Sequence, residues 1–142
     1  MGNGESARKR AVRAYIDGFR TGDHEAILAL LTDDVTWEMP GFIDIRGKDA
    51  FDKEIEHDAF EGLPQLTIER LVEEDDVVVA VGAVEAARKD GETLRAVFAD
   101  VFYFEGDKIR RLETYQMENG SSASRRDGFR SQDDPKPSSQ NR

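Results

Sequence analysis

The stretch that decides the fold is AVFADVFYF, residues 96–104, which is rich in β-branched and aromatic residues and has neither glycine nor proline. This composition predicts a β-strand long enough to cross a whole sheet. Side chains alternate between the two faces of a strand, so the stretch divides into two sets. One face carries Phe98, Asp100, Phe102 and Phe104, and the other carries Val97, Ala99, Val101 and Tyr103.

Asp100 is the charged residue of this predicted strand. A strand that is apolar on both faces is typically covered on both, and burial raises the pKa of a carboxyl group that lacks a partner. Two interpretations follow. Asp100 is either at a wet rim or hydrogen-bonded to backbone, or it is a functional acid in a hydrophobic pocket.

The composition bounds the class of protein. A chain of 142 residues suits one domain with a single core, and 38% hydrophobic with 35% charged residues indicates a globular protein with a polar surface. The absence of cysteine excludes a disulfide scaffold, a thiolate nucleophile and a cysteine-ligated zinc site, and agrees with a cytoplasmic location. We expect no signal peptide in residues 1–13 and no membrane span, because the longest apolar run, residues 77–84, is short.

The net charge of −10 is concentrated in the body of the chain, since residues 1–10 and 119–142 are both basic. An acidic body repels nucleic-acid phosphates and anionic lipid surfaces. We therefore expect neither nucleic acid nor a membrane as a partner.

Apolar residues at helical spacing predict three helices, at about residues 7–21, 24–31 and 48–60. Gly22 is expected to end the first helix and Asp23 to cap the second. Gly62 and Pro64 are expected to end the third helix.

Apolar runs between turn residues predict strands at about residues 35–39, 65–72, 77–88, 94–104 and 108–117, with a loop or short strand at 42–46. Gly82 marks a candidate bulge or bend in the third of these strands. Helices followed by an antiparallel meander are typical of an α+β fold. We expect a strongly curved, mostly antiparallel sheet whose concave side is closed by the three N-terminal helices around a cone-shaped interior.

This order of elements resembles the fold family of nuclear transport factor 2, which includes scytalone dehydratase, the SnoaL-like polyketide cyclases and ketosteroid isomerase. The resemblance covers about residues 7–117. The segments that carry it are Tyr15-Ile16, Thr21-Gly22-Asp23, Asp33-Asp34-Val35, Ile45-Arg46-Gly47 and Asp100-Val101. The fold hosts enzymes and binding modules alike, so the resemblance predicts architecture more sharply than activity.

Ketosteroid isomerase uses an Asp base and an oxyanion hole made of a Tyr and a protonated Asp. By resemblance, Tyr15 and Asp100 occupy the oxyanion-hole positions, where both can donate to a developing enolate oxygen. The alternative is a core tyrosine hydrogen-bonded to a buried acid without chemistry. The position of the base falls on Met39, which cannot take a proton, and Glu38 would point to the other face of its strand. The chain therefore departs from the standard isomerase.

Glu54 is the best alternative base, because the resemblance implies that its helix position projects into the pocket. It could equally be an exposed residue on the flank of the helix. Gln116 either orients a ligand or is an ordinary polar residue near the end of a sheet. The remaining candidates are core residues in one interpretation and pocket walls in the other, and they are Phe19, Trp37, Met39, Phe51, Ile55, Phe98 and Phe102.

No cofactor and no metal are expected. Glu54, His57 and Asp58 have a spacing that could hold a metal, but charged residues on an exposed helix commonly produce it. Epoxide hydrolases of similar fold position water with an Asp–Arg–Asp set, and only Asp100 can be matched to it here.

We expect a flexible N-terminus at residues 1–6, one domain at 7–118 and a disordered tail at 119–142. The predicted function is cofactor-independent acid–base catalysis on a small, mostly apolar carbonyl or epoxide compound, of the isomerase, cyclase, dehydratase or hydrolase type. The alternative is a non-catalytic ligand-binding or dimerisation module. A homodimer through the outer face of the sheet is expected, since Val97, Val101 and Tyr103 are apolar there.

Overall fold

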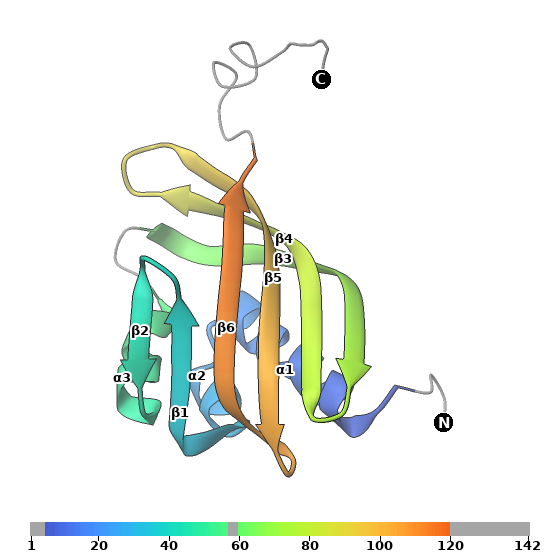
Figure 1. Cartoon of the computed structure of the whole chain (residues 1–142). Helices are drawn as coiled ribbons and strands as arrows, with labels where there is room; N and C mark the ends of the chain where they lie inside the picture. The colour runs from blue at the N-terminus through green and yellow to red at the C-terminus, as the bar shows by residue number, and fades with distance from the viewer. Residues whose placement is uncertain (1–4, 57–59, 120–142) are drawn as a thin grey trace.

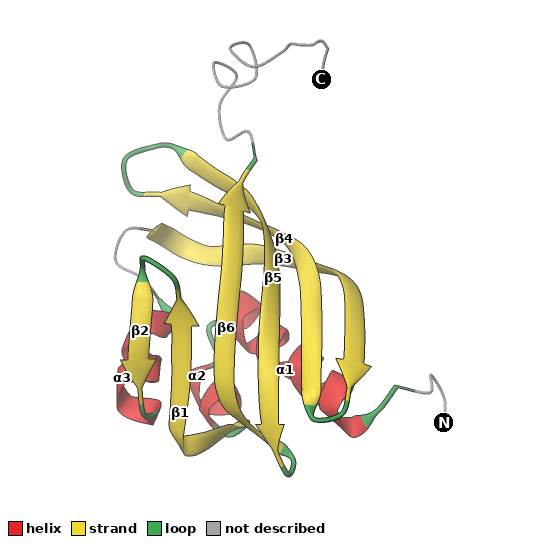
Figure 2. Ribbon diagram, in the orientation of Figure 1, coloured by secondary structure: helices red, strands yellow, loops and turns green. Residues whose placement is uncertain are grey.

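The computed structural model describes residues 5–56 and 60–119, which form three helices and six strands (Figure 2). In chain order the elements are α1 (Ala7–Thr21), α2 (His24–Leu28), β1 (Leu31–Met39), β2 (Ile43–Arg46), α3 (Lys48–Ile55), β3 (Phe60–Glu74), β4 (Val77–Arg88), β5 (Thr93–Glu105) and β6 (Lys108–Glu118).

The six strands form one curved, open sheet in the order β2-β1-β6-β5-β4-β3. β1 runs parallel to β6, and the other neighbouring strands are antiparallel. The three helices lie on one face of this sheet, with α1 against β3 and β4 and α3 against β1 and β2 (Figure 1). The predicted α+β class with a mostly antiparallel curved sheet is confirmed. Only α1 and α2 precede the sheet in the chain, because α3 follows β2.

The ends of the first two helices follow from local chemistry. The side chain of Ser6 accepts a hydrogen bond from the backbone N–H of Lys9 and caps α1. Gly22 ends α1 with a φ of 69°, in the left-handed region that glycine adopts without strain. The side chain of Asp23 accepts from the N–H of Ala26 at the start of α2. The predicted roles of Gly22 and Asp23 are confirmed.

Two predicted boundaries were wrong. The second helix ends at Leu28, so Leu31 is the first residue of β1, where it is buried. Gly62 and Pro64 lie inside β3 instead of ending a helix. β3 is an edge strand, and a proline is tolerated there because its missing N–H need not pair with a further strand.

Several register shifts interrupt the pairing of the long strands, and two of them are bulges of a single residue. In β6, Arg110 is an extra residue, because Tyr103 pairs with Arg111 while Phe104 pairs with Ile109. In β3, Glu69 is the extra residue, opposite Gly82 and its neighbour on β4. The irregularity expected at Gly82 therefore belongs to the partner strand.

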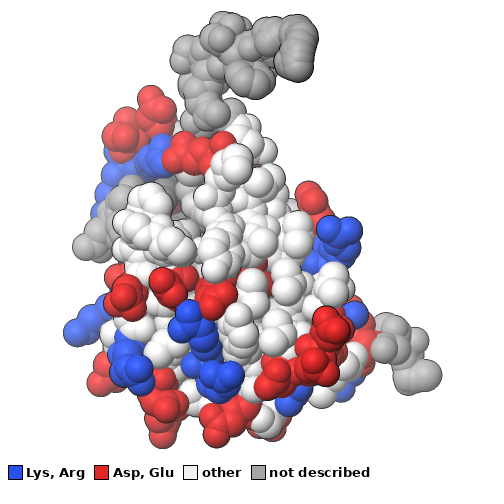
Figure 3. Space-filling model, viewed as in Figure 1, with Lys and Arg blue, Asp and Glu red and all other residues white. Residues whose placement is uncertain are grey.

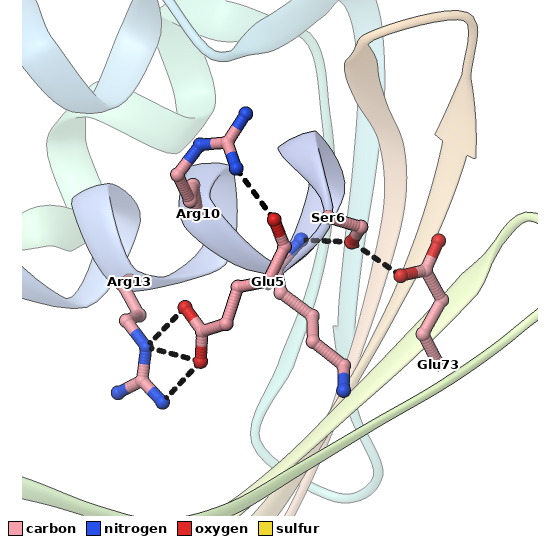
Figure 4. Close-up of polar contacts among 6 residues, drawn as sticks. Glu5, Ser6, Arg10, Arg13 and Glu73 are labelled. Carbon is pink, nitrogen blue, oxygen red and sulfur yellow. Dashed lines mark hydrogen bonds and ion pairs between the residues drawn. The ribbon is translucent and has the colours of Figure 1, made fainter. Parts of the chain in front are cut away.

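The start of α1 is tied to the sheet. The hydroxyl of Ser6 donates to the carboxylate of Glu73 near the end of β3, and Arg13 binds the carboxylate of Glu5 with an N···O distance of 2.7 Å (Figure 4). Of the segment expected to be flexible, Glu5 and Ser6 thus make defined contacts, and residues 1–4 lie outside the described part of the chain. Nearly all of the predicted tail, residues 120–142, also lies outside it.

The face of the sheet opposite the helices is partly apolar. Figure 3 shows uncharged side chains across the centre of this face, with charged residues around its margins and across its lower part. Exposed apolar residues on its strands include Val97, Tyr115 and Met117, with exposed fractions of 43%, 49% and 70%. Among the described residues, no helix is both long and apolar enough to cross a bilayer.

Candidate functional site

Asp100 lies in the middle of β5 on the face that the helices cover. The alternation predicted from the sequence is confirmed, since Phe98, Phe102 and Phe104 are buried on the same face. Asp100 is only 8% exposed, and its atom Oδ1 is buried without a hydrogen-bond partner. A buried and unsatisfied carboxyl oxygen is costly in a folded protein, so it needs an explanation other than stability.

The surroundings of Asp100 change its protonation. Burial raises the pKa of Asp100 from its ordinary 3.8 to about 7, because the charged form loses its hydration. A hydrogen bond from the side chain of Thr114 acts in the opposite direction and stabilises the carboxylate. At neutral pH, Asp100 therefore populates both the acid and the carboxylate.

Thr114 is held in turn by Trp37. Thr114 is directly opposite Asp100 in the pairing of β5 with β6. The indole N–H of Trp37, on β1, donates to the hydroxyl oxygen of Thr114 over 3.0 Å, and both side chains are buried. Side chains from three adjacent strands therefore follow one another, from Trp37 on β1 through Thr114 on β6 to Asp100 on β5.

Tyr15 approaches the same place from α1. It is 2% exposed, and its ring lies 5.1 Å from that of Phe102 and 5.0 Å from that of Phe19 between centroids. Burial raises the pKa of Tyr15, and the negative charge of Asp100 raises it further. Tyr15 thus keeps its proton at neutral pH and can act as a hydrogen-bond donor.

Aromatic rings surround the pair. Trp37 stacks on Phe51 with 4.7 Å between centroids, and Phe19 meets the edge of Trp37 at 6.4 Å. Ile55 is buried beside Phe51 on α3. The structure thus brings together most of the predicted pocket residues, and they contact one another as a continuous aromatic cluster.

The remaining predicted residues lie outside this aromatic cluster. Phe98 is buried two residues before Asp100 on β5, where it pairs with Gly82 on β4 and with Gln116 on β6. Gln116 is exposed, and Met39 is half-buried at the end of β1. Glu54 is half-buried on α3, and within the described part of the chain it has neither a hydrogen bond nor an ion pair.

Glu38 points away from the site, as the alternation of β1 predicted. Its carboxylate accepts from Arg111 on the outer face of the sheet, with an N···O distance of 3.0 Å. Glu38 therefore cannot supply the base that is missing at position 39.

The predicted metal spacing cannot be compared with the structure, because His57 and Asp58 lie outside the described residues. The other histidine, His24, has a different role. Its Nδ1 lies 2.5 Å from Asp52 on α3, and its Nε2 lies 2.8 Å from Glu56, the residue that directly follows α3. These hydrogen bonds raise the pKa of His24 and connect α2 to α3.

Sequence reasoning did not assign a role to Thr114 or to the indole nitrogen of Trp37. Counting outward from the β5–β6 turn, where Glu105 pairs with Lys108, places Asp100 opposite Glu113. The extra residue at Arg110 shifts the pairing by one, so that Thr114 faces Asp100 instead. The usable signal was that Thr114 is a polar residue in phase with Leu112 on an otherwise apolar face.

Comparisons with known proteins agree with this architecture. The sequence matches the family model of the SnoaL-like domain over residues 12–112. No curated protein matches the chain significantly. The fold is similar to that of an LEH-like epoxide hydrolase from M. tuberculosis, with 19% identity, a TM-score of 0.69, and coverage of 78% of this chain and 83% of that one.

Two further solved structures are similar. An NTF2-like protein from Anabaena variabilis has 21% identity and a TM-score of 0.72, with 85% of this chain and 97% of that chain covered. A protein provisionally named a polyketide cyclase, from Xanthomonas campestris pv. campestris, has 25% identity and a TM-score of 0.67, with 78% and 92% covered. With the family model matching most of its length, the chain belongs to the SnoaL-like domain family, within the nuclear transport factor 2-like superfamily.

Proposed function

We propose that this protein is a cofactor-independent enzyme that uses Asp100 as an acid and base on an oxygen of a small, mostly apolar carbonyl or epoxide compound. The observation that carries the proposal is a buried carboxyl with one unpartnered oxygen, Oδ1, whose pKa burial raises to about 7. Such a group can protonate or hydrogen-bond a substrate oxygen and then recover its proton at neutral pH.

The surroundings define the class of substrate. Tyr15 supplies a second donor, and the aromatic residues Phe19, Phe51 and Phe102 favour an apolar ligand. We propose that the substrate oxygen binds at Oδ1 of Asp100, and that the space between the helices and the sheet forms a cone-shaped pocket for the rest of the substrate. The names of two similar structures, an epoxide hydrolase and a polyketide cyclase, agree with chemistry at a substrate oxygen.

Glu54 is the proposed proton shuttle. It lies on α3 next to the buried Ile55 and is itself half-buried. By the resemblance to ketosteroid isomerase, the position of the base falls on Met39, which cannot take a proton. Replacing Glu54 with Gln should slow exchange of the α-hydrogen of a cyclic ketone in D2O by about 100-fold, the usual contribution of one general base. Diol formation from a cyclic epoxide, measured in parallel, separates proton abstraction from hydration.

The first experiment is a spectroscopic titration with a graded series of phenols, because a phenolate resembles an enolate oxygen. Wild-type protein should bind phenols saturably, and Asp100→Asn should weaken binding about tenfold or more and change its pH dependence. Glu113→Gln, on the opposite face of the sheet, is the matched control and should bind like wild type. Absence of binding by the folded wild-type protein would contradict the proposal.

The second candidate is a binding or dimerisation module without catalysis. The mutual packing of Trp37 and Phe51 favours it, because side chains that fill the interior leave less room for a substrate. A homodimer through the outer face of the sheet belongs to either function, given the exposed Val97, Tyr115 and Met117. Val97→Lys should then lower the mass measured by light scattering, whereas Phe42→Lys, at an exposed turn, should not.

A further inference from the structure

We propose that Trp37 and Thr114 form a hydrogen-bond chain that directs the acidic proton of Asp100 to Oδ1, the carboxyl oxygen that has no hydrogen-bond partner among the described residues. Thr114 is then a positioning residue, and Trp37 fixes the orientation of its hydroxyl. This inference rests on the acid–base role proposed above for Asp100, since both residues act through that carboxyl.

The first step is the contact between Trp37 and Thr114. An indole N–H can only donate, so the hydroxyl oxygen of Thr114 is the acceptor over their 3.0 Å separation. Both side chains are buried, with exposed fractions of 8% and 7%, so water does not compete strongly for the hydroxyl. With its oxygen accepting from Trp37, the hydroxyl has its own proton free to donate elsewhere.

The second step is the contact between Thr114 and Asp100. The two residues are directly opposite each other across β5 and β6, and the side chain of Thr114 hydrogen-bonds the carboxyl group. Because Oδ1 has no partner, we infer that the hydroxyl of Thr114 faces the other carboxyl oxygen. A proton added to Asp100 then goes to Oδ1, because the second oxygen already accepts a hydrogen bond.

The third step is the balance of influences on Asp100. From α1 the titratable group facing it is Tyr15, from β4 the opposite residue is Ala80, and from β6 it is Thr114. Burial favours the neutral acid, and the hydrogen bond from Thr114 favours the carboxylate. Thr114 therefore has two effects on Asp100. It directs the proton to Oδ1, and it keeps the proton affinity of the carboxyl group in the range where an acid–base group works best at neutral pH.

The test is a titration of the ¹³C carboxyl signal of Asp100 by NMR in the full chain without ligand, assigned by its loss in Asp100→Asn. Thr114→Val keeps the shape of the side chain and removes the hydroxyl, so it should raise the proton affinity of Asp100 about tenfold, or about one pH unit. Thr114→Ser keeps the hydroxyl and should restore the wild-type titration. Trp37→Phe should shift the titration in the same direction by a smaller amount, because the hydroxyl becomes free to rotate.

Thr36→Val, on the opposite face of β1 from Trp37, is the matched control and should titrate like wild type. An unchanged titration in folded Thr114→Val overturns the role of Thr114, and Thr114→Ala replaces that variant if it does not fold. A shift in Thr114→Val without one in Trp37→Phe overturns the role of Trp37.

Phenol binding by the same variants separates this inference from the proposed function. If wild type binds no phenol but the titration shifts as expected, the proposed function fails and the hydrogen-bond chain stands. If phenols bind through Asp100 and the titration of Thr114→Val is unchanged, the chain fails and the proposed function stands.

Discussion

The ring of Phe98 on β5 occupies the space directly over Gly82 on β4. The two residues are opposite each other in the sheet, and a Cβ atom at position 82 would lie 2.9 Å from Cζ of Phe98. The same Cβ would lie 2.0 Å from the carbonyl oxygen of Thr67 on β3. Glycine is required here because two neighbouring strands approach too closely for any side chain, at the bulge around Glu69.

The first prediction concerns this contact. Gly82→Ala should lower the free energy of unfolding by about 3 kcal/mol or more, because the backbone of Thr67 cannot move aside as a flexible side chain could. Gly106→Ala is the control, since a Cβ there meets nothing within 4 Å and only the φ of 64° is unfavourable. Gly106→Ala should lower the free energy of unfolding by about 1 kcal/mol. Urea denaturation measures both, and equal costs would contradict the steric explanation.

The second prediction concerns Asp100 and the pH dependence of stability. Its pKa is about 7 in the folded protein against an ordinary 3.8, so between these values the folded state binds more protons than the unfolded state. The contribution of Asp100 to the free energy of unfolding therefore falls as the pH rises from the lower to the higher of these two pKa values, and it is constant above the higher one. Wild type should lose about 2–3 kcal/mol relative to Asp100→Asn between about pH 5 and about pH 8.

Urea denaturation of the two proteins across this range gives the comparison, and other titrating groups cancel in the difference. A difference in stability that is independent of pH would show that Asp100 titrates normally. A difference that grows in the opposite direction would mean that the carboxylate is the form that folding favours.

The third prediction concerns His24, which connects α2 to α3. Hydrogen bonds to Asp52 and then Glu56 raise the pKa of His24, so its contribution to stability is complete below its ordinary pKa of 6.5 and is lost as pH rises through the higher folded value. His24→Gln should therefore be destabilised relative to wild type in mild acid and approach wild type in alkaline solution. Thermal denaturation at both pH values measures this.

Salt provides the control for His24. The side chain is partly exposed, so the difference between wild type and His24→Gln in mild acid should shrink in about 1 M salt, where the Debye length is about 3 Å. A difference that is unaffected by both pH and salt would assign His24 to packing instead of charge.

The fourth prediction concerns Arg8, which joins two hairpin turns that are distant in the sequence. Its guanidinium donates to the carbonyl of Gly106 over 2.9 Å and to the carbonyl of Asp75 over 3.1 Å, and it lies over the ring of Phe104 at 5.4 Å. A lysine cannot reach both carbonyls in this planar geometry. Arg8→Lys should cost about 1–2 kcal/mol of stability by urea denaturation.

Arg13→Lys is the matched control for Arg8, because Arg13 lies on the same helix and binds Glu5 in its own segment of the chain. Arg13→Lys should change the free energy of unfolding by less than about 0.5 kcal/mol, because most exposed ion pairs contribute little to stability. Equal costs for the two variants would mean that Arg8 does not hold the turns together.

Local features of this protein were predictable from the sequence because their causes lie within a few residues. The alternation of residues 96–104 predicted the buried face of Asp100, and Gly22 and Asp23 predicted the end of one helix and the start of the next. Pro64 was misread because a proline is compatible with an edge strand, and the position of a strand in the sheet is not a local property.

The sequence by itself determined that Asp100 is placed among aromatic side chains on the inner face of a strand, because a period of two residues is a local property. Only the tertiary structure decided what Asp100 meets. The extra residue at Arg110 shifts β6 by one position and brings Thr114 opposite it, and the parallel pairing of β1 with β6 brings Trp37 to Thr114. The physical reason is that strand register depends on hydrogen bonds and packing between two segments, here 77 residues apart. The sequence of either segment alone does not specify which residues of the other it will pair with.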